Sequence, residues 1–371
     1  MRVSAGRAVL AVALLLAPAA ARSAAPADRL LVRGLFDATF VDTDDGSRLL
    51  SENGGDPAMD LGLRLWLGGD LGAGFQAIVV GLGQGGRASD AGEADADLEQ
   101  AYVRWTSTGA VRLTVDSGRI VVPFGDFSRR YLSSSNPLIG APDGYGVSYP
   151  IGIVAMGSVA RFDYRAGVID APLVNDKYVP EPGRAYRPGL EIGVTPTVGL
   201  RIGAYGTIGP YLGPEVASSL PTGESWRDFE QRVAAMNLEL SRGHFALHAE
   251  YAMSDYEVPT LASRAKGRQW FVEPAYAWTP RLFTALRLEA NDYPYIAPLG
   301  PAFWIAPNAQ FRDLEAAVGW RFSRGLVVKT SYRLDKWRVE PSLRAMLPDG
   351  HAVALQVSYA FDVLSWFDAT R

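Results

Sequence analysis

Apolar and polar residues alternate with a period of two along most of the chain. The clearest run is 61–67, where leucine occupies every odd position and Gly62, Arg64 and Trp66 lie between. The same alternation recurs in four further segments, at 190–195, 200–205, 245–252 and 353–361. Because successive side chains of a strand point to opposite faces of a sheet, these runs predict β-strands with one apolar and one polar face.

The connections between the predicted strands alternate between short turns and long polar loops. We expect short turns near Gly69-Asp70, Thr108-Gly109, Phe162-Asp163, Pro196-Thr197, Arg242-Gly243, Thr279-Pro280 and Arg324-Gly325. We expect loops rich in Gly, Pro, Asp and Ser at 43–58, 83–96, 122–151, 172–186, 210–230, 255–267, 292–308 and 337–349. Seven turns and eight loops join sixteen strands, although 152–171 could also form one strand instead of two. This alternation of short and long connections is typical of an all-β, antiparallel transmembrane β-barrel of the bacterial outer membrane.

The N-terminus carries the pattern of a secretory signal. Two arginines precede an apolar run at 8–17, and small residues follow through Ala25. The run is shorter than the roughly 20 apolar residues that a membrane-spanning helix needs. We therefore expect residues 1–25 to be a cleaved signal peptide and 26–371 to form a single β-barrel domain in the outer membrane of a Gram-negative bacterium. After this segment no stretch suits a spanning helix, so entry into a membrane requires a closed barrel.

Composition and charge exclude several classes of protein. The 371 residues include 36 basic and 40 acidic side chains, no cysteine, and a formal net charge of −4. This mixed charge offers no basic surface for nucleic acid, and the absence of cysteine removes disulfides and thiolate metal sites. Several aromatic residues lie near predicted turns or the last strand end, as in the interfacial girdles of membrane barrels: Trp105, Trp278, Trp320, Phe322, Tyr359 and Phe361.

If the apolar face meets lipid, the polar face lines the barrel interior. This inward set mixes both signs of charge: Arg33, Asp37, Arg64, Arg104, Arg112, Asp116, Glu191, Arg201, Glu239, Glu250, Glu273, Arg287, Glu289, Glu315, Arg321, Lys329, Arg333 and Asp335. Such charges are solvated at low cost in the aqueous lumen that sixteen strands leave. The strand arginines could form a path for anions, or each could pair with a lumen carboxylate and hold the wall together.

The longest connection, 122–151, contains turn-forming residues and no amphipathic pattern. A loop of this length within a compact domain is commonly functional, and we predict that it folds into the lumen and narrows the pore. For Arg129 and Arg130 a pore role is favoured, because the only acidic residues near them in this loop are Asp126 and Asp143. The predicted constriction and anion path comprise Arg104, Arg112, Arg119, Asp126, Arg129, Arg130 and Arg201.

Two motifs carry a resemblance to a known family. The passage Gly118-Arg119-Ile120-Val121-Val122-Pro123-Phe124-Gly125, followed by a loop rich in Ser, Asn and Pro, resembles the phosphate-selective porin (O/P-type) family, where a similar segment precedes the constriction loop. Tyr164-Arg165-Ala166-Gly167-Val168-Ile169-Asp170 is similar to that family's Tyr-x-x-Gly-Val-Phe-Asn-Gly strand, with Ile and Asp replacing Phe and Asn.

This resemblance implies a porin that lets small hydrophilic solutes or ions diffuse passively, with phosphate among the candidate anions. It also implies contact with outer-membrane lipids and a homo-oligomer, a trimer by family analogy. The predicted constriction loop departs from the family pattern because it contains no lysine and carries only Arg129 and Arg130.

Two other classes of function stay open. The barrel could house a periplasmic partner and conduct nothing, or it could be a membrane-embedded hydrolase that uses His244, His248 and His351. In a strand, His244 and His248 lie about 13 Å apart along the axis, too far to share one metal ion. We therefore expect no catalytic residues, no metal and no cofactor, and predict that the protein is not an enzyme.

Overall fold

The computed structural model describes residues 30–44, 55–86, 94–109, 112–145, 147–171, 185–259, 261–293, 310–338 and 349–364. The predicted signal peptide, 1–25, lies outside these ranges. In the part of the chain that is described, no helix has the length and apolar character needed to cross a membrane.

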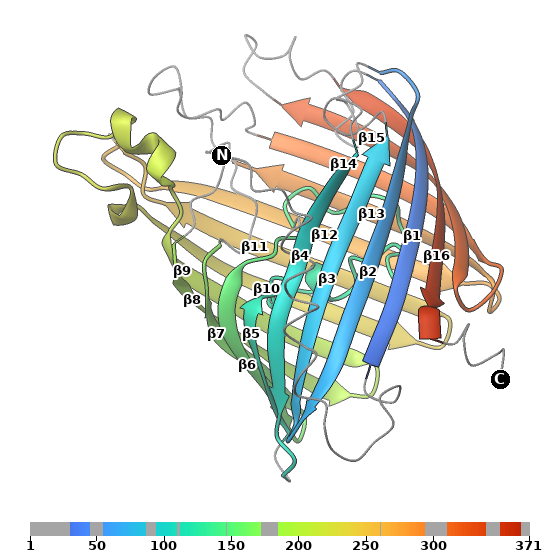
Figure 1. Cartoon of the computed structure of the whole chain (residues 1–371). Helices are drawn as coiled ribbons and strands as arrows, with labels where there is room; N and C mark the ends of the chain where they lie inside the picture. Colours follow the sequence, from blue (N-terminus) through green and yellow to red (C-terminus); the bar gives the residue numbers. More distant parts are fainter. Residues whose placement is uncertain are drawn as a thin grey trace.

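Sixteen antiparallel strands of the described chain close into one barrel, with β1 hydrogen-bonded to β16 (Figure 1). Their bounds are β1 (Leu30–Thr43), β2 (Ala58–Gly72), β3 (Phe75–Gly86), β4 (Asp95–Thr106), β5 (Leu113–Arg119), β6 (Ile151–Val159), β7 (Phe162–Ile169), β8 (Arg187–Thr197), β9 (Leu200–Pro210), β10 (Glu230–Arg242), β11 (Phe245–Tyr256), β12 (Ala265–Ala277), β13 (Leu282–Asp292), β14 (Gln310–Arg321), β15 (Leu326–Arg338) and β16 (Gly350–Asp362). The predicted fold class and strand count are confirmed, and 152–171 forms two strands.

Short and long connections alternate around the barrel as predicted, but some turns are displaced. The first turn lies at Ala73-Gly74 instead of Gly69-Asp70, because β2 and β3 continue to pair as far as Gly72 and Phe75. Ala73 and Gly74 have φ values of 53° and 82°, which suit a two-residue hairpin. An alternating pattern locates strands well, but it does not show where a glycine-rich ladder stops.

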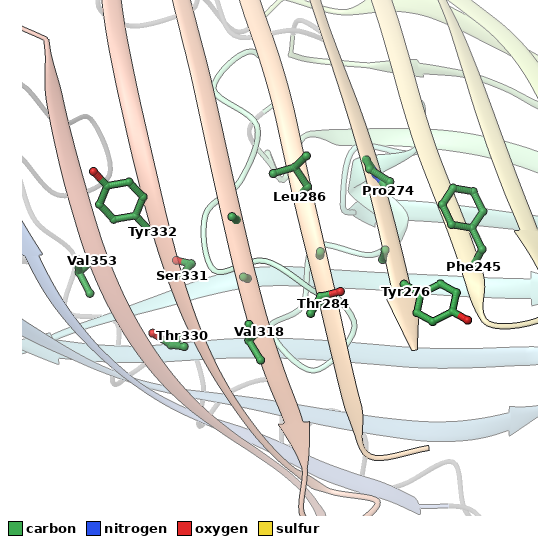
Figure 2. A pocket seen from close by; sticks show the side chains of 14 residues that line it. Phe245, Pro274, Tyr276, Thr284, Leu286, Val318, Thr330, Ser331, Tyr332 and Val353 are labelled. Atoms are coloured by element: carbon green, nitrogen blue, oxygen red, sulfur yellow. The ribbon is translucent and has the colours of Figure 1, made fainter. Parts of the chain in front are cut away.

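The outer face of the barrel is apolar. On β2, four leucines that point outward, at positions 61, 63, 65 and 67, are each 39 or 40% exposed. Figure 2 shows part of this face, a groove on β11 to β16 whose lining includes Tyr276, Leu286, Val318 and Tyr332. Trp278 is among the exposed aromatics beside the short turns. An apolar outer band with aromatic residues at its edge is the arrangement expected of a barrel in lipid.

Candidate functional site

The connection between β5 and β6, residues 120–150, lies inside the barrel and is called the inner loop here. Apart from the short helix η4 (Phe127–Arg129), its described backbone is irregular. Its apolar side chains pack against inward-facing wall residues in one cluster: Ile120, Val122, Phe124, Phe127 and Tyr145 against Val154, Ile169, Tyr205, Val233, Ala235, Ala252 and Phe271. The inward folding predicted from sequence is therefore confirmed.

Two glycines allow the inner loop to approach the wall closely. A Cβ added to Gly189 of β8 would overlap the ring of Phe124, which is only 4% exposed. Gly125 has a φ of 85°, which L side chains rarely adopt, and it directs the next amide, that of Asp126, towards Glu250. The Pro-Phe-Gly segment is thus the anchor of the loop on the wall.

Glutamates of the wall accept hydrogen bonds from backbone amides of the inner loop. The bonds run from Gly125 N to Glu191 (3.2 Å), Asp126 N to Glu250 (2.9 Å), Asp143 N to Glu289 (2.9 Å), and Ile139 N and Gly140 N to Glu315 (3.1 and 3.2 Å). An irregular segment cannot pair its own backbone groups as a ladder does, so a buried one needs other partners. These carboxylates are the partners of the loop amides.

Cations of the wall bind the loop carbonyls in the same way. Lys329 Nζ donates to the carbonyls of Ser133, Asn136 and Leu138, each at 2.9 Å. Arg287 donates to the next carbonyls along the loop, those of residues 140 and 141, at 2.9 and 3.2 Å. The sequence predicted that these charges line water, whereas the side chains of Lys329 and Arg287 are buried beneath the loop.

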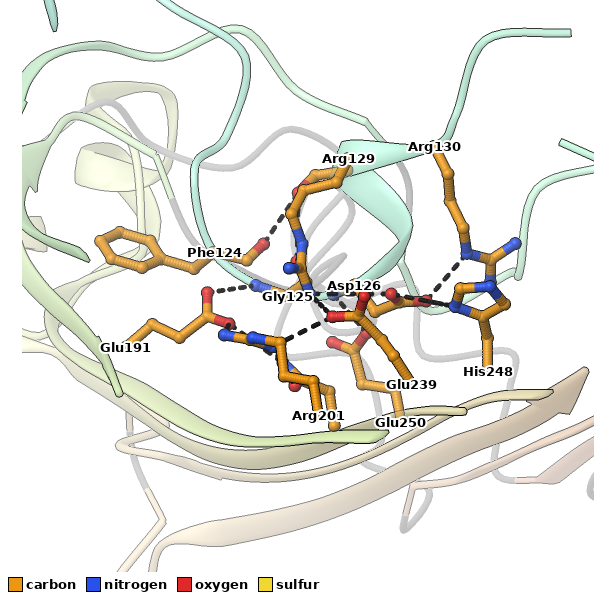
Figure 3. Close-up of polar contacts among 12 residues, drawn as sticks. Phe124, Gly125, Asp126, Arg129, Arg130, Glu191, Arg201, Glu239, His248 and Glu250 are labelled. Carbon is orange, nitrogen blue, oxygen red and sulfur yellow. Dashed lines mark hydrogen bonds and ion pairs between the residues drawn. The ribbon is translucent and has the colours of Figure 1, made fainter. Parts of the chain in front are cut away.

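Asp126 is the centre of the polar contacts in Figure 3, and its carboxylate is buried. Arg130 Nε donates to Asp126 Oδ2 at 2.8 Å, and His248 Nδ1 lies 3.0 Å from the same oxygen and 3.1 Å from Oδ1. Although burial raises the pKa of Asp126, the hydrogen bond with His248 and the charge of Arg130 outweigh burial and lower it to about 2. Asp126 is therefore ionised at neutral pH.

The two loop arginines are bound by wall carboxylates. Arg130 Nη1 contacts Glu273 at 2.5 Å, and Arg129 forms an ion pair with Glu239 while lying 3.7 Å from Asp126. Glu239 and Glu273 were predicted to face the lumen, but their pairing with Arg129 and Arg130, which are 110 and 143 positions away, was not predicted. Closure of the barrel creates these pairs, so no local pattern could indicate them.

Two of the predicted strand arginines are also paired. Arg201 contacts Asp163 at 2.6 Å, Glu191 at 2.9 Å and Glu239 at 3.1 Å. Arg104 makes two hydrogen bonds of 2.8 Å with the Asp116 carboxylate. For Arg201 and Arg104 this geometry corresponds to the hypothesis that the strand arginines pair with lumen carboxylates within the wall.

The remaining two predicted site residues lie elsewhere. Arg112 is exposed and immediately precedes β5, beside a short turn. Arg119 pairs in register with Ala101 and Ile151, and Ile151 is exposed on the outer face. Arg119 therefore occupies an outward register position and not one in the lumen.

The opposite side of the lumen, formed by β1 to β4, has a different character. Arg64 binds Glu99 through two hydrogen bonds of 2.5 and 2.8 Å, and Tyr149 of the inner loop donates to the same carboxylate at 2.8 Å. A pocket of about 290 Å³ lies beside this pair, and its polar lining is Asp37, Thr39, Asp60, Arg64 and Gln84. The inner loop also reaches this side, where Ser133 donates to Asp37 at 2.5 Å.

Further carboxylates extend this acidic side. Asp95 and Asp97 are exposed, and neither they nor Asp37 forms an ion pair within the described ranges. Asp95, Asp97 and Glu99 were not among the residues predicted to face inward, because the β3 and β4 ladder shifts register after Val80 and interrupts the alternation.

The three histidines lie in separate surroundings. His248 contacts Asp126, His244 contacts the carbonyl of Ala277 beside a short turn, and His351 contacts Asp44. One candidate metal cluster occurs in the described residues, with donor atoms of Asp126, Glu239 and His248 within 4.8 Å of one another. The guanidinium of Arg129 already lies against both carboxylates of this cluster.

Sequence comparisons find no match, either to a protein-family model or to a curated protein. Solved structures are similar. OmpF of Salmonella typhi in complex with daunomycin has a TM-score of 0.63 and 13% identity, covering 92% of this chain and 100% of that one. The anion-selective porin from Comamonas acidovorans has a TM-score of 0.57 and 12% identity, covering 90% and 99%. OmpT of Vibrio cholerae lacking loop L8, an outer membrane protein, has a TM-score of 0.57 and 11% identity, covering 90% of this chain and 99% of that one.

At these identities the likeness concerns the fold alone. None of the three is described as a phosphate-selective porin, so the finer resemblance stays a prediction. The closed barrel of sixteen antiparallel strands is the fold shared with the outer-membrane porins.

Proposed function

We propose that the chain forms a water-filled pore through which small hydrophilic solutes or ions diffuse passively across the outer membrane. The main observation behind this proposal is a closed barrel with an apolar outer face, a charged inner face, and an inner loop that packs against its interior wall. Export by the signal peptide, outer-membrane location, assembly as a trimer, and the absence of enzymatic activity belong to the same proposal.

The conduit runs along β1 to β4. The wall from β8 to β15 is covered by the inner loop, whose backbone uses the charges of that wall as hydrogen-bond partners. Beside β1 to β3, in contrast, a pocket lined by Asp37, Thr39 and Gln84 is open. The solvated part of the lumen is thus one side of the barrel and not its centre.

The charge of this conduit favours cations over anions such as phosphate. Asp37, Asp95 and Asp97 form no close ion pair with a described basic side chain, while Arg64 is neutralised by Glu99. In water, a carboxylate about 6 Å from a passing ion contributes roughly 0.7 kcal/mol, about a threefold local enrichment of cations. An anion path would need unpaired guanidinium groups, and the loop arginines and Arg201 are held in ion pairs.

Reversal potentials of single channels in planar bilayers under a salt gradient test this proposal. We expect a cation preference that falls by about threefold per charge in Asp37→Asn and Asp97→Asn. Asp42→Asn is the matched control, since Asp42 is an exposed residue of β1 at an outward register position. An anion preference lost in Arg129→Ala/Arg130→Ala would overturn the selectivity argument. A folded barrel without conductance would favour the alternative of a barrel that houses a partner.

A further inference from the structure

Two polar residues of neighbouring strands lie directly opposite each other on the wall that faces the inner loop. Glu239 of β10 pairs in register with His248 of β11. Both lie on the inward face, which they share with the buried residues Asn237 and Glu250. Directly opposite residues of an antiparallel pair hold their Cβ atoms about 4.5 to 5.5 Å apart. The ladder therefore presents one carboxylate and one imidazole side by side.

The inner loop adds a third donor to this pair. Asp126, the residue before η4, has its two carboxylate oxygens 3.0 and 3.1 Å from His248 Nδ1. Donor atoms of Asp126, Glu239 and His248 all lie within 4.8 Å of one another. Figure 3 shows these side chains meeting from the loop and from the wall, and they are called the loop-wall triad here.

The spacing and the chemistry of the triad suit a small divalent metal ion. Zinc binds imidazole nitrogen and carboxylate oxygen at about 2.1 Å, so two ligands of a tetrahedral site lie about 3.4 Å apart. Asp126 and His248 are already near this separation, and a shift of less than about 1.5 Å in the Glu239 side chain, which is 28% exposed, completes the set. One nitrogen and two oxygens suit zinc and related transition ions, whereas magnesium and calcium prefer oxygen alone.

Arg129 now supplies the positive charge at the triad. Its guanidinium forms an ion pair with Glu239 and lies 3.7 Å from Asp126. Each carboxylate also has another arginine, because Arg130 donates to Asp126 at 2.8 Å and Arg201 contacts Glu239 at 3.1 Å. The side chain of Arg129 is 27% exposed and that of Arg130 only 10%. Arg129 can therefore move into the water of the lumen and leave both carboxylates paired.

The charge around the triad favours a divalent ion over the Arg129 guanidinium. Arg287, which lies 3.7 Å from Glu273, is bound by Glu315 at 2.6 Å and leaves the balance unchanged. With His248 neutral, the set of paired side chains has a formal charge of −1, and a divalent ion in place of the monovalent guanidinium brings it to zero. Unbalanced charge is costly where water is partly excluded, so this exchange is favourable. The set consists of Asp126, Asp163, Glu191, Glu239 and Glu273 with Arg129, Arg130, Arg165 and Arg201.

We propose that Asp126, Glu239 and His248 bind a divalent transition-metal ion of the zinc class, which takes the place of the Arg129 guanidinium. The bound ion joins the inner loop to β10 and β11 through its own ligand bonds, and it therefore holds the loop more firmly than the ion pair that it replaces. The inference goes beyond the proposed function and does not depend on it, because the triad lies between loop and wall whether or not the barrel conducts.

Calorimetric titration of Zn²⁺ into the folded full-length barrel, produced without a polyhistidine tag, tests this inference. His248→Ala should weaken zinc binding by more than about a hundredfold, because loss even of an outer partner of a metal ligand costs about 10- to 100-fold. Glu239→Gln, which keeps the size of the side chain, should weaken it by at least about tenfold. Arg129→Ala should bind zinc roughly fivefold more tightly, because a partly exposed ion pair no longer competes. A gain of affinity cannot result from misfolding.

The matched control is His244→Ala/His351→Ala, which removes the other two histidines of the chain and leaves the triad intact. His351 also contacts a carboxylate, that of Asp44 at 2.6 Å, but it belongs to no group of three donors within the described ranges. The control should bind zinc as the unaltered barrel does.

Three results would each overturn the inference: equal weakening by the control and by His248→Ala, unchanged or weaker zinc binding in Arg129→Ala, or binding of Mg²⁺ as tight as that of Zn²⁺. Conductance is a separate readout. A barrel that binds zinc but conducts no ions contradicts the pore proposal alone, and one that conducts ions but binds no zinc contradicts this inference alone.

Discussion

Glu315 is the wall residue whose loss should most clearly release the inner loop. One carboxylate oxygen accepts the amides of Ile139 and Gly140, and the other accepts Arg287 Nη2 at 2.6 Å. Its side chain is 0% exposed. Hydrogen bonds to a charged group contribute about 1.5 to 3 kcal/mol each, so Glu315→Ala should destabilise this part of the loop by at least about 3 kcal/mol. Leaving Arg287 with a weakened set of partners adds to that cost.

Amide hydrogen exchange of the folded barrel, followed by mass spectrometry, measures this release directly. If local opening governs exchange, about 3 kcal/mol corresponds to roughly a hundredfold faster exchange in peptides that contain Ile139 and Gly140. The control is Asp335→Ala, because Asp335 is also a buried carboxylate and pairs with Arg333 at 2.8 Å, whereas the amides of Ile139 and Gly140 donate to Glu315. Exchange in Glu315→Ala equal to that in the control would refute the view that wall carboxylates hold the loop.

Three further predictions concern the same loop. Gly189→Leu should displace Phe124 from β8 towards the conduit and lower single-channel conductance, and a second change, Phe124→Ala, should restore the original conductance. Asp126 has a lowered pKa of about 2, so it should contribute about 2 kcal/mol to the free energy of unfolding at pH values above its ordinary pKa, and this contribution should disappear as pH falls towards 2. Asp126→Asn should abolish this pH dependence in acid unfolding. In urea unfolding, Arg130→Ala should lower the free energy of unfolding by about 3 to 5 kcal/mol, because it leaves a buried wall glutamate unpaired. Arg129→Ala should lower it by about 1 kcal/mol, because the Arg129 side chain is partly exposed.

Much of the architecture follows from local sequence patterns. Alternation with a period of two and the rhythm of short and long connections were sufficient to predict sixteen strands and their order. Both signals are local, because the face of a side chain and the length of a connection depend on neighbouring residues alone. The inward folding of the connection after Arg119 was predicted on the same basis, from its length and lack of pattern.

The roles of the charged side chains could not be predicted in this way. Glu191, Glu250 and Glu315 were placed correctly on the inner face, but nothing near them in sequence shows that a distant loop covers them. Their partners are backbone amides, which carry no sequence signature, at separations of 66, 124 and 176 residues. The same limit applies to Arg130, because its partner Glu273 comes near only when the barrel closes.

Two classes of interior charge follow from this arrangement. On β8 to β15, carboxylates and cations act as substitutes for the ladder partners that the loop backbone lacks, so their loss should change stability and loop position. On β4, Asp95 and Asp97 face the open side of the lumen and form no ion pair within the described chain, so their loss should change ion preference and leave the loop in place. Asp97→Asn should therefore leave amide hydrogen exchange at Gly140 unchanged. If it accelerated that exchange as strongly as Glu315→Ala does, this division would be wrong, because charge alone, and not contact with the loop, would then hold the loop in place.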